Sequence, residues 1–250
     1  MKQKVFRKNT YRPQIKDKLM KNILARGGIE FLAVFLGIGL SFYVEQWQSD
    51  NEQKDLLVKD CQNILTDVDE DIFTINKIID SNNIILKACD NIQSIVTSDE
   101  VIVVDSIILD LNKLTYPTFF GITRSYKLSY STGRLNLYAN EKLVKEISKL
   151  YDHFYERLDI NSNIYDQVGL KFLDQYVDKH IGYAIRGYDY DSNEIIDFFT
   201  NKLFINELIT FSGRVNGYLQ RLNETKEQLI IVKELLIDYL AVQNKSKVIN

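Results

Sequence analysis

The sequence predicts an all-α protein: an N-terminal transmembrane helix that continues into a long rod, with an antiparallel helical bundle packed on the rod. No glycine or proline occurs between Gly39 and Pro117, and these two residues are the strongest breakers of helices. Apolar residues also recur at helical spacing through most of the chain. The expected order is a basic tail (1–26), a transmembrane helix (27–47), a rod helix (48–98), a bundle (99–243) and a frayed tail (244–250).

The run GIEFLAVFLGIGLSFYVEQWQ at residues 28–48 is the proposed membrane span. From Gly27 to Val44 a helix is about 27 Å long, close to the roughly 30 Å of a hydrocarbon core. A buried core helix and a cleaved secretion signal are the alternatives. No small-x-small cleavage site follows the run, and a soluble core helix would not explain the basic block before it. An uncleaved single-pass anchor is therefore the favoured interpretation.

Charge on either side of the run predicts its orientation. Residues 1–26 hold nine basic residues and one acid, a local charge of +8 in a chain of net charge −3. Residues 45–60 hold five acids and two lysines. The positive-inside rule places the N-terminus in the cytoplasm and the body outside, across a bacterial inner membrane. The basic tail could also bind nucleic acid, but its position beside an apolar run favours anionic lipid as the partner.

One face of the proposed span carries small residues. Ala33, Gly37 and Ser41 recur every four residues, a spacing that lets two membrane helices approach closely. Glu30 and Glu45 lie near the ends of the run, and an acid within a membrane segment is a functional candidate. We expect self-association through the small face, with Glu30 and Glu45 as possible pore or interface acids.

Beyond the span, periodicity predicts the long helices. The rod stripe steps by four or three residues through Leu57, Cys61, Ile64, Val68, Ile72, Ile75 and Ile79, an eleven-residue repeat. Asp105 is expected to cap a short helix, 121–131 to be helical, and Asn140 to cap a helix over about 141–180. A loop at 182–193 and a last helix over about 203–243 complete the bundle.

The usual signs of chemistry are missing from the sequence. Cys61 and Cys89 would lie about 42 Å apart on one helix, so they cannot pair within a chain and are expected in the core. His153 and His180 lack partners at ligand or catalytic spacing. We therefore predict no catalysis, no metal and no cofactor.

Two acidic stretches and one tyrosine cluster are the other candidates for a functional role. The segment 189–193 opens like a calcium loop but lacks the required glycine and final glutamate, so it is expected to cap the next helix. Asp67, Asp69 and Asp71 are interpreted as a solvated face. The remaining candidates for a contact surface are the tyrosines of the 182–193 loop, namely Tyr183, Tyr188 and Tyr190.

Two stretches together resemble a family of small bacterial membrane proteins abundant in Bacteroidetes-type genomes. The first is Gly28-Ile29-Glu30 followed by an apolar run with Gly37-Ile38 that ends at Trp47. The second is Ser131-Thr132-Gly133-Arg134-Leu135-Asn136-Leu137-Tyr138 before a long helix. Val44-Glu45-Gln46 departs from the amide-rich residues usual before that tryptophan. The resemblance implies a single-pass anchor and a helical extramembrane domain, and it supplies no catalytic residues.

The sequence thus favours a membrane-anchored interaction or scaffold protein, homo-oligomeric and without catalysis, whose bundle binds a protein partner. The alternative is an oligomeric pore or channel, for example a membrane effector of an antiviral defence system. An enzyme with an unrecognised site is the third possibility.

Overall fold

The structure is a computed structural model that describes residues 14–98 and 101–249, with side chains over 27–98 and 101–245. Its helices are α1 (Gln14–Thr97), α2 (Val104–Leu111), α3 (Arg124–Ser131), α4 (Arg134–Tyr138), α5 (Glu141–Lys149), η1 (Leu150–Tyr155), α6 (Glu156–Gly169), η2 (Leu170–Val177), α7 (Asp178–Ile185), α8 (Ser192–Thr200) and α9 (Lys202–Ile249). The described residues contain no strand, so the all-α prediction is confirmed. The side chains of the basic tail lie outside the described residues.

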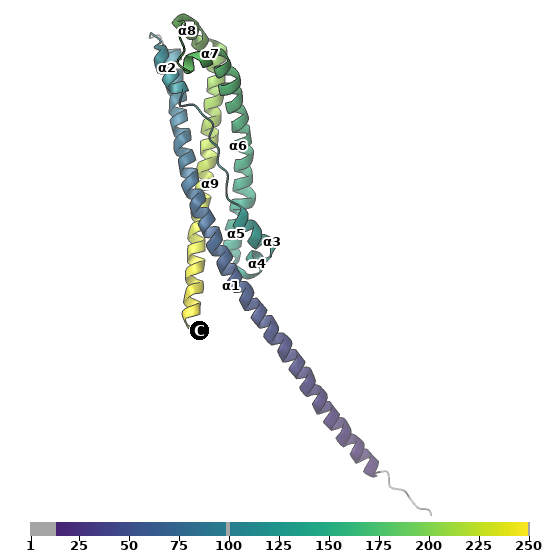
Figure 1. The fold of residues 1–250 in the computed structure, drawn as a ribbon. Helices are drawn as coiled ribbons and strands as arrows, with labels where there is room; N and C mark the ends of the chain where they lie inside the picture. Colours follow the sequence, from purple (N-terminus) through teal and green to yellow (C-terminus); the bar gives the residue numbers. More distant parts are fainter. Residues whose placement is uncertain (1–13, 99–100, 250) are drawn as a thin grey trace, which may run out of the picture. The chain divides into compact units, whose positions relative to one another are not determined.

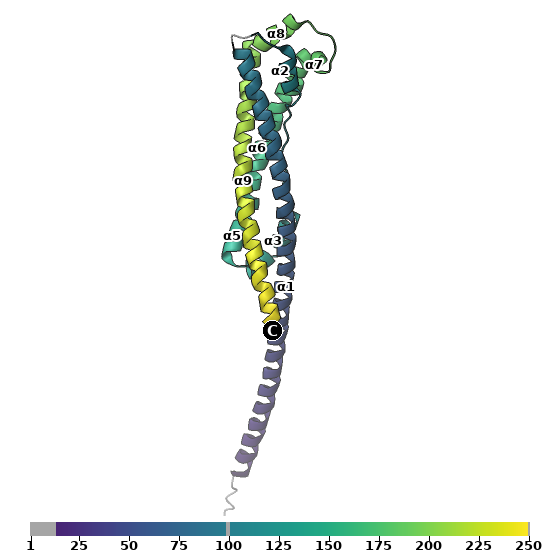
Figure 2. The same cartoon turned by 90° about the vertical axis from the view of Figure 1, so that its left-hand side faces the viewer.

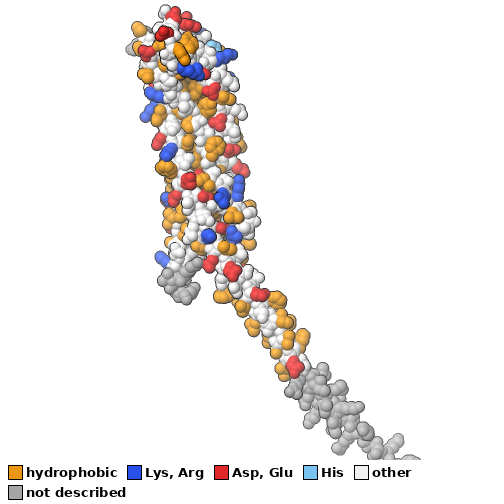
Figure 3. Space-filling model, viewed as in Figure 1, with side chains coloured by type: hydrophobic (Ala, Val, Ile, Leu, Met, Phe, Trp, Pro, Cys, Tyr) orange, Lys and Arg blue, Asp and Glu red, His pale blue; other side chains and the backbone are white. Residues whose placement is uncertain are grey.

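The chain divides into two compact units, whose boundary falls inside α1 between Lys54 and Asp55. In the first unit every described side chain as far as Ser49 is exposed. Many of these exposed side chains are large and apolar, and few charges interrupt them on the face that Figure 3 shows. By length and composition, α1 is able to cross a membrane, with a mean hydropathy of 1.8 over its most apolar 18-residue window.

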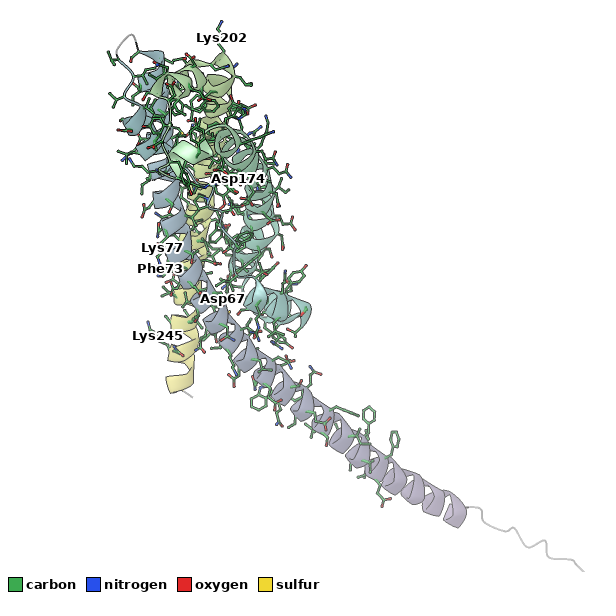
Figure 4. All side chains as sticks on the ribbon, turned by 45° about the horizontal axis from the view of Figure 1, so that its top comes forward. Asp67, Phe73, Lys77, Asp174, Lys202 and Lys245 are labelled. Carbon is green, nitrogen blue, oxygen red and sulfur yellow. The ribbon has the colours of Figure 1, made fainter. Side chains whose placement is uncertain are left out.

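The second unit is a bundle of three long helical segments. They are the 55–97 portion of α1, the almost unbroken run from α5 to α7, and α9, which lie side by side in two perpendicular views (Figures 1 and 2). α9 runs antiparallel to the other two. α2, α7 and α8 close one end of this unit, and α3 and α4 lie near the other end. Lys202 and Lys245 mark the two ends of α9 in Figure 4.

The core of the bundle follows the stripe predicted for α1. Leu57, Cys61, Ile64, Val68, Ile75 and Ile79 are buried, and Ile72 is half-buried against them. Both cysteines are free and buried, as expected, and burial raises the pKa of each thiol to about 12. The eleven-residue repeat thus correctly identified the side of α1 that packs against the other helices.

An irregular segment, residues 112–123, returns the chain from α2 to α3 along the side of the bundle. Such a segment cannot satisfy its own buried backbone groups, so side chains from the long helices must do so. Asn82 donates to the carbonyl of Pro117 at 3.2 Å, and the amide of Phe119 donates to the Tyr218 hydroxyl at 2.9 Å. Tyr116 donates to Asp174 at 2.7 Å, with Asp174 visible on η2 in Figure 4. The 112–123 segment is therefore fastened by all three long helical segments.

Helix capping was predicted correctly at two positions and wrongly at one. The Asn140 side chain accepts from the Leu143 amide and caps α5, and Asp191 caps α8. Asp105, in contrast, lies inside the first turn of α2, where its carboxylate accepts from the Tyr190 hydroxyl instead of capping the helix. The contact with Tyr190 thus decided the role of Asp105. Its place in the first turn of the helix is still favourable without a capping hydrogen bond, because a negative charge there interacts with the helix dipole.

Candidate functional site

A pocket of about 360 Å³ opens between residues 119–127, which include the end of the 112–123 segment and the first turn of α3, and the helical run that begins at α5. This volume falls at the small end of the range of ligand pockets. Its walls come from two stretches of chain far apart in sequence. The lining residues are Phe119, Phe120, Gly121, Thr123, Tyr126, Lys127, Tyr151, Asp152, Tyr155, Glu156, Leu158 and Asp159.

A π-helical turn, η1, shapes one wall of this pocket. π-helical turns interrupt α-helices rarely and are frequent at functional sites. Here the turn carries Tyr151, Asp152 and Tyr155. The two tyrosine rings are buried, whereas Asp152 is exposed. The local widening of the helix thus presents two tyrosines and one acid to the same cavity.

Asp71 on α1 lies directly behind this wall and is only 1% exposed. Its carboxylate accepts from the Ile122 amide at 3.0 Å and from the Tyr155 hydroxyl in a short hydrogen bond. Burial raises the pKa of Asp71 to about 6, against the lowering effect of these hydrogen bonds. The interpretation of Asp71 as part of a solvated face was wrong, because this residue joins the 112–123 segment to η1.

The two neighbouring acids have different surroundings. Asp67 is half-buried and accepts from the Ser125 amide at 3.3 Å, and Figure 4 shows it on α1. Asp69 is exposed and pairs with Lys233 of α9 at 2.7 Å. Helix α3 starts at Arg124, three residues later than predicted. The contacts with α1 agree with this late start, because the backbone amides of Ile122 and Ser125 donate hydrogen bonds to Asp71 and Asp67.

A signal in the sequence could have identified Asp71. It follows Val68 by three residues and precedes Ile75 by four, so it occupies a position of the buried stripe itself. Asn82, also fully buried, follows Ile79 by three residues in the same way. A polar residue at a stripe position must find a buried partner, because an unpaired polar group in a core is costly. Both residues hold the 112–123 segment.

The aromatic wall is built from rings that pack on one another. Tyr126 stacks on Tyr151 with ring centroids 4.3 Å apart and planes 3° from parallel, and Tyr151 meets Tyr155 edge to face at 5.1 Å. Tyr126 donates to the Asp152 carboxylate at 2.8 Å, and burial together with this bond raises its pKa to about 12. The Tyr151 hydroxyl is buried and has no hydrogen-bond partner among the described residues.

Gly121 allows the 112–123 segment to reach this wall. A Cβ atom at this position would lie 2.2 Å from the Tyr155 ring, a distance that real Cβ contacts do not show. The backbone of Gly121 therefore passes directly over the ring. A larger residue would separate the segment from η1 and break the contact between Ile122 and Asp71.

The segment 131–138, which carries the second family-like pattern and includes α4, is attached to α1 by side-chain contacts. Gly133 adopts a positive φ of 74°, which favours glycine. Arg134 forms a two-bond ion pair with Asp60, at 2.8 and 3.2 Å, and Leu135 is fully buried. Leu137, in contrast, is 74% exposed. Most of the pattern thus has a structural role in the bundle.

The other residues singled out in the sequence lie apart from the pocket. Tyr190 is tied to Asp105, Tyr183 is half-buried against the core, and Tyr188 is exposed, so the proposed tyrosine surface stays a prediction. Ala33, Gly37, Ser41, Glu30 and Glu45 are all exposed on the first unit, and Ser41 donates to the Gly37 carbonyl at 2.9 Å. This bond satisfies the serine hydroxyl within its own helix.

Metal-ligating side chains do not converge anywhere in the part of the chain that the structure describes. No group of three or more histidines, cysteines, aspartates or glutamates there could hold a metal ion. His153 and His180 are both exposed; Nδ1 of His180 lies 2.7 Å from the Tyr176 carbonyl oxygen, and its ring packs near those of Tyr176 and Phe198.

Together these features define a class: an all-helical protein whose described residues include one helix able to span a membrane and a bundle that holds an acid-rimmed aromatic pocket. The chain belongs to the family of unknown function DUF6090, whose model matches residues 30–196. That match includes most of the apolar run, the 112–123 segment and the 131–138 pattern. No curated protein and no solved structure matches the chain.

Proposed function

We propose that this chain is a single-pass membrane protein whose helical bundle binds a partner on the extracytoplasmic side. One observation carries the proposal: every side chain over 27–47 is exposed, including twelve large apolar ones that would be covered by lipid. A core helix of a soluble protein would bury such residues within the chain. The basic residues before the span and the acids after it support the orientation.

Membrane extraction tests the anchor. Wild-type protein should remain in the pellet after alkaline carbonate treatment, whereas Phe35→Arg/Leu36→Arg should appear in the supernatant. An arginine at the centre of a span costs about 2.5–3.5 kcal/mol on insertion scales. The swap Phe35→Leu/Leu36→Phe keeps the apolar character and should stay in the pellet. Release of the wild-type protein by carbonate would refute the anchor.

Cysteine labelling tests the side of the membrane, because both native cysteines are at most 1% exposed and should not react. A membrane-impermeant maleimide should label Lys179→Cys, exposed on α7, in intact spheroplasts. Gln3→Cys in the basic tail should react only after permeabilisation. The opposite pattern would place the bundle in the cytoplasm and overturn the proposed topology.

Self-association through the small face is the second part of the proposal. A Cβ atom added at Gly37 or at Gly39 would meet no atom within 4 Å, so neither substitution strains the monomer. The two positions lie about 200° apart around the helix, because each residue turns it by about 100°. Light scattering of the detergent-extracted protein should show Gly37→Leu losing the oligomer and Gly39→Leu keeping it. Equal masses for the two variants would exclude this face.

An oligomeric pore is the second candidate, and the spacing of the acids favours it. Glu30 and Glu45 continue the spacing of Ala33, Gly37 and Ser41, so that all five positions lie on one side of α1. A mass of four or more copies, together with ion flux through liposomes that Glu30→Gln/Glu45→Gln alters, would support a pore. A dimer would leave no lumen and would favour the interaction protein.

A further inference from the structure

The aromatic pocket is lined by tyrosine and phenylalanine rings, and the proposed membrane anchor gives no reason for this lining. Buried rings form its walls, and Phe120, which is 72% exposed, stands at its rim. The faces of aromatic rings carry negative charge density and attract cations. Pockets of this kind are suited to ligands that combine an apolar body with a positive charge.

The charged residues of the pocket point to the same class of ligand. Asp152, Glu156 and Asp159 are spaced four and three residues apart, so they lie along one face of the helical run and repel one another. None of the three forms an ion pair among the described residues. Lys127 is the one basic residue in the lining, so three negative charges and one positive charge sum to −2. A bound cation would relieve this repulsion.

We propose that this pocket binds a small organic cation, an amine or quaternary ammonium with an apolar body of a few carbon atoms. The rings would contact the methyl or methylene groups and the charge, while Glu156 and Asp159 would attract the charge from the rim. A bare metal ion fits less well, because the lining is largely aromatic and the described residues hold no metal-ligating cluster. Asp71, bonded to Tyr155 behind the wall, adds a further acid to the cation's surroundings.

Titration calorimetry with two matched pairs of probes tests the proposal on the full-length protein in a non-ionic detergent. The first pair is choline and its neutral isostere 3,3-dimethyl-1-butanol, and the second is n-butylammonium and 1-butanol. Binding of at least one cation, with its neutral counterpart at least about tenfold weaker, is the expected result. Equal binding of charged and neutral probes, or binding of neither cation, would overturn the proposal.

Exposed substitutions then locate the binding site without disturbing the core. Glu156→Gln/Asp159→Asn should weaken binding of the cation about fivefold to tenfold, and added salt should weaken it in the wild type. Glu227→Gln/Glu234→Gln removes the same charge from exposed positions of α9 and should leave the affinity unchanged. Phe120→Leu keeps apolar area but removes the ring face, so it should also weaken binding. Equal affinities for the two double variants would place the cation elsewhere.

The outcome is independent of the proposed membrane anchor. Carbonate extraction reports on the first unit, and calorimetry reports on the second unit. If the protein binds choline but is released by carbonate, the cation-binding proposal stands and the membrane-anchor proposal fails. If it resists carbonate but binds neither cation, the anchor proposal stands and the cation-binding proposal fails.

Discussion

Replacing Arg134 with methionine is expected to lower the free energy of unfolding of the bundle by about 3 kcal/mol, since it leaves the Asp60 carboxylate buried without its partner. The side chains of Asp60 and Arg134 are only 8% and 14% exposed, and two hydrogen bonds join them. Breaking such a pair costs more than the pair contributes, because an uncompensated charge remains in the core. For a unit of this size the loss corresponds to a fall in Tm of roughly 6–12 °C.

Thermal unfolding of the detergent-solubilised protein, followed by circular dichroism, measures this loss. Tryptophan fluorescence would not report on the bundle, because the single tryptophan, Trp47, lies in the first unit. Arg186→Met is the matched control, because it breaks an exposed pair with Asp178 and should change Tm little. Asp60→Asn/Arg134→Met should recover part of the loss by removing the buried charge. A Tm for Arg134→Met equal to that of the control would contradict the structural role given to the 131–138 segment.

Replacing Asp71 with alanine is expected to cost about 2–3 kcal/mol, because it leaves the Ile122 amide and the Tyr155 hydroxyl without their acceptor. Asp69→Ala, two residues away, removes only an exposed partner of Lys233 and should have little effect. Tyr155→Phe should be destabilising, whereas Tyr151→Phe, which removes a hydroxyl without a partner, should be neutral or stabilising. The same melting experiment distinguishes these four variants.

The sign of the pH dependence follows from the raised pKa of Asp71. The folded protein holds this proton up to about pH 6, whereas the unfolded chain releases it near 3.8, so folding is favoured at the lower pH. The free energy of unfolding should therefore fall as pH rises from about 4 to about 6, by up to about 3 kcal/mol from this group. Asp67, Glu70, Tyr151 and Tyr155 surround the carboxyl, and the two acids raise its pKa.

Asp71→Asn isolates this contribution, because an amide keeps an acceptor and does not titrate. The stability difference between wild type and Asp71→Asn should shrink or reverse as pH rises from about 4 to about 6, because only the wild type loses stability over this range. A difference that stays constant from pH 4 to pH 8 would show that Asp71 keeps an ordinary pKa in the folded protein.

The pocket and the stability of the bundle depend on the same contacts. Asp71 holds Ile122 and Tyr155, Gly121 brings the backbone onto the Tyr155 ring, and Asn82 holds Pro117. The wall of the pocket that comes from the 112–123 segment therefore exists only while the long helices satisfy its backbone. A variant that loosens this segment should lose both Tm and cation binding, whereas the rim variants should lose binding alone.

Local and periodic features could be predicted from the sequence alone. The fold class, the buried stripe of α1, the cap at Asn140 and the burial of both cysteines follow from residue type and spacing within one helix. The apolar run was recognisable for the same reason, because a continuous stretch of large apolar side chains is a property of composition and length. These features do not depend on which other segment a residue meets.

The tertiary structure alone decided which polar residues are buried and what they bind. Asp69 and Asp71 are the same residue type two positions apart, yet one meets solvent and Lys233 while the other meets Tyr155, which is 84 residues further along the chain. The Asp105 carboxylate likewise accepts a hydrogen bond from the hydroxyl of Tyr190, a residue distant in sequence that the fold brings close. The pocket arises where the irregular segment crosses a π-helical turn. The segment has no periodic pattern, and the periodicity that predicts a helix over 141–180 does not reveal the π-helical turn within it. Hydrophobic spacing determines which side of a helix is buried, but the partner of each buried polar group depends on long-range packing.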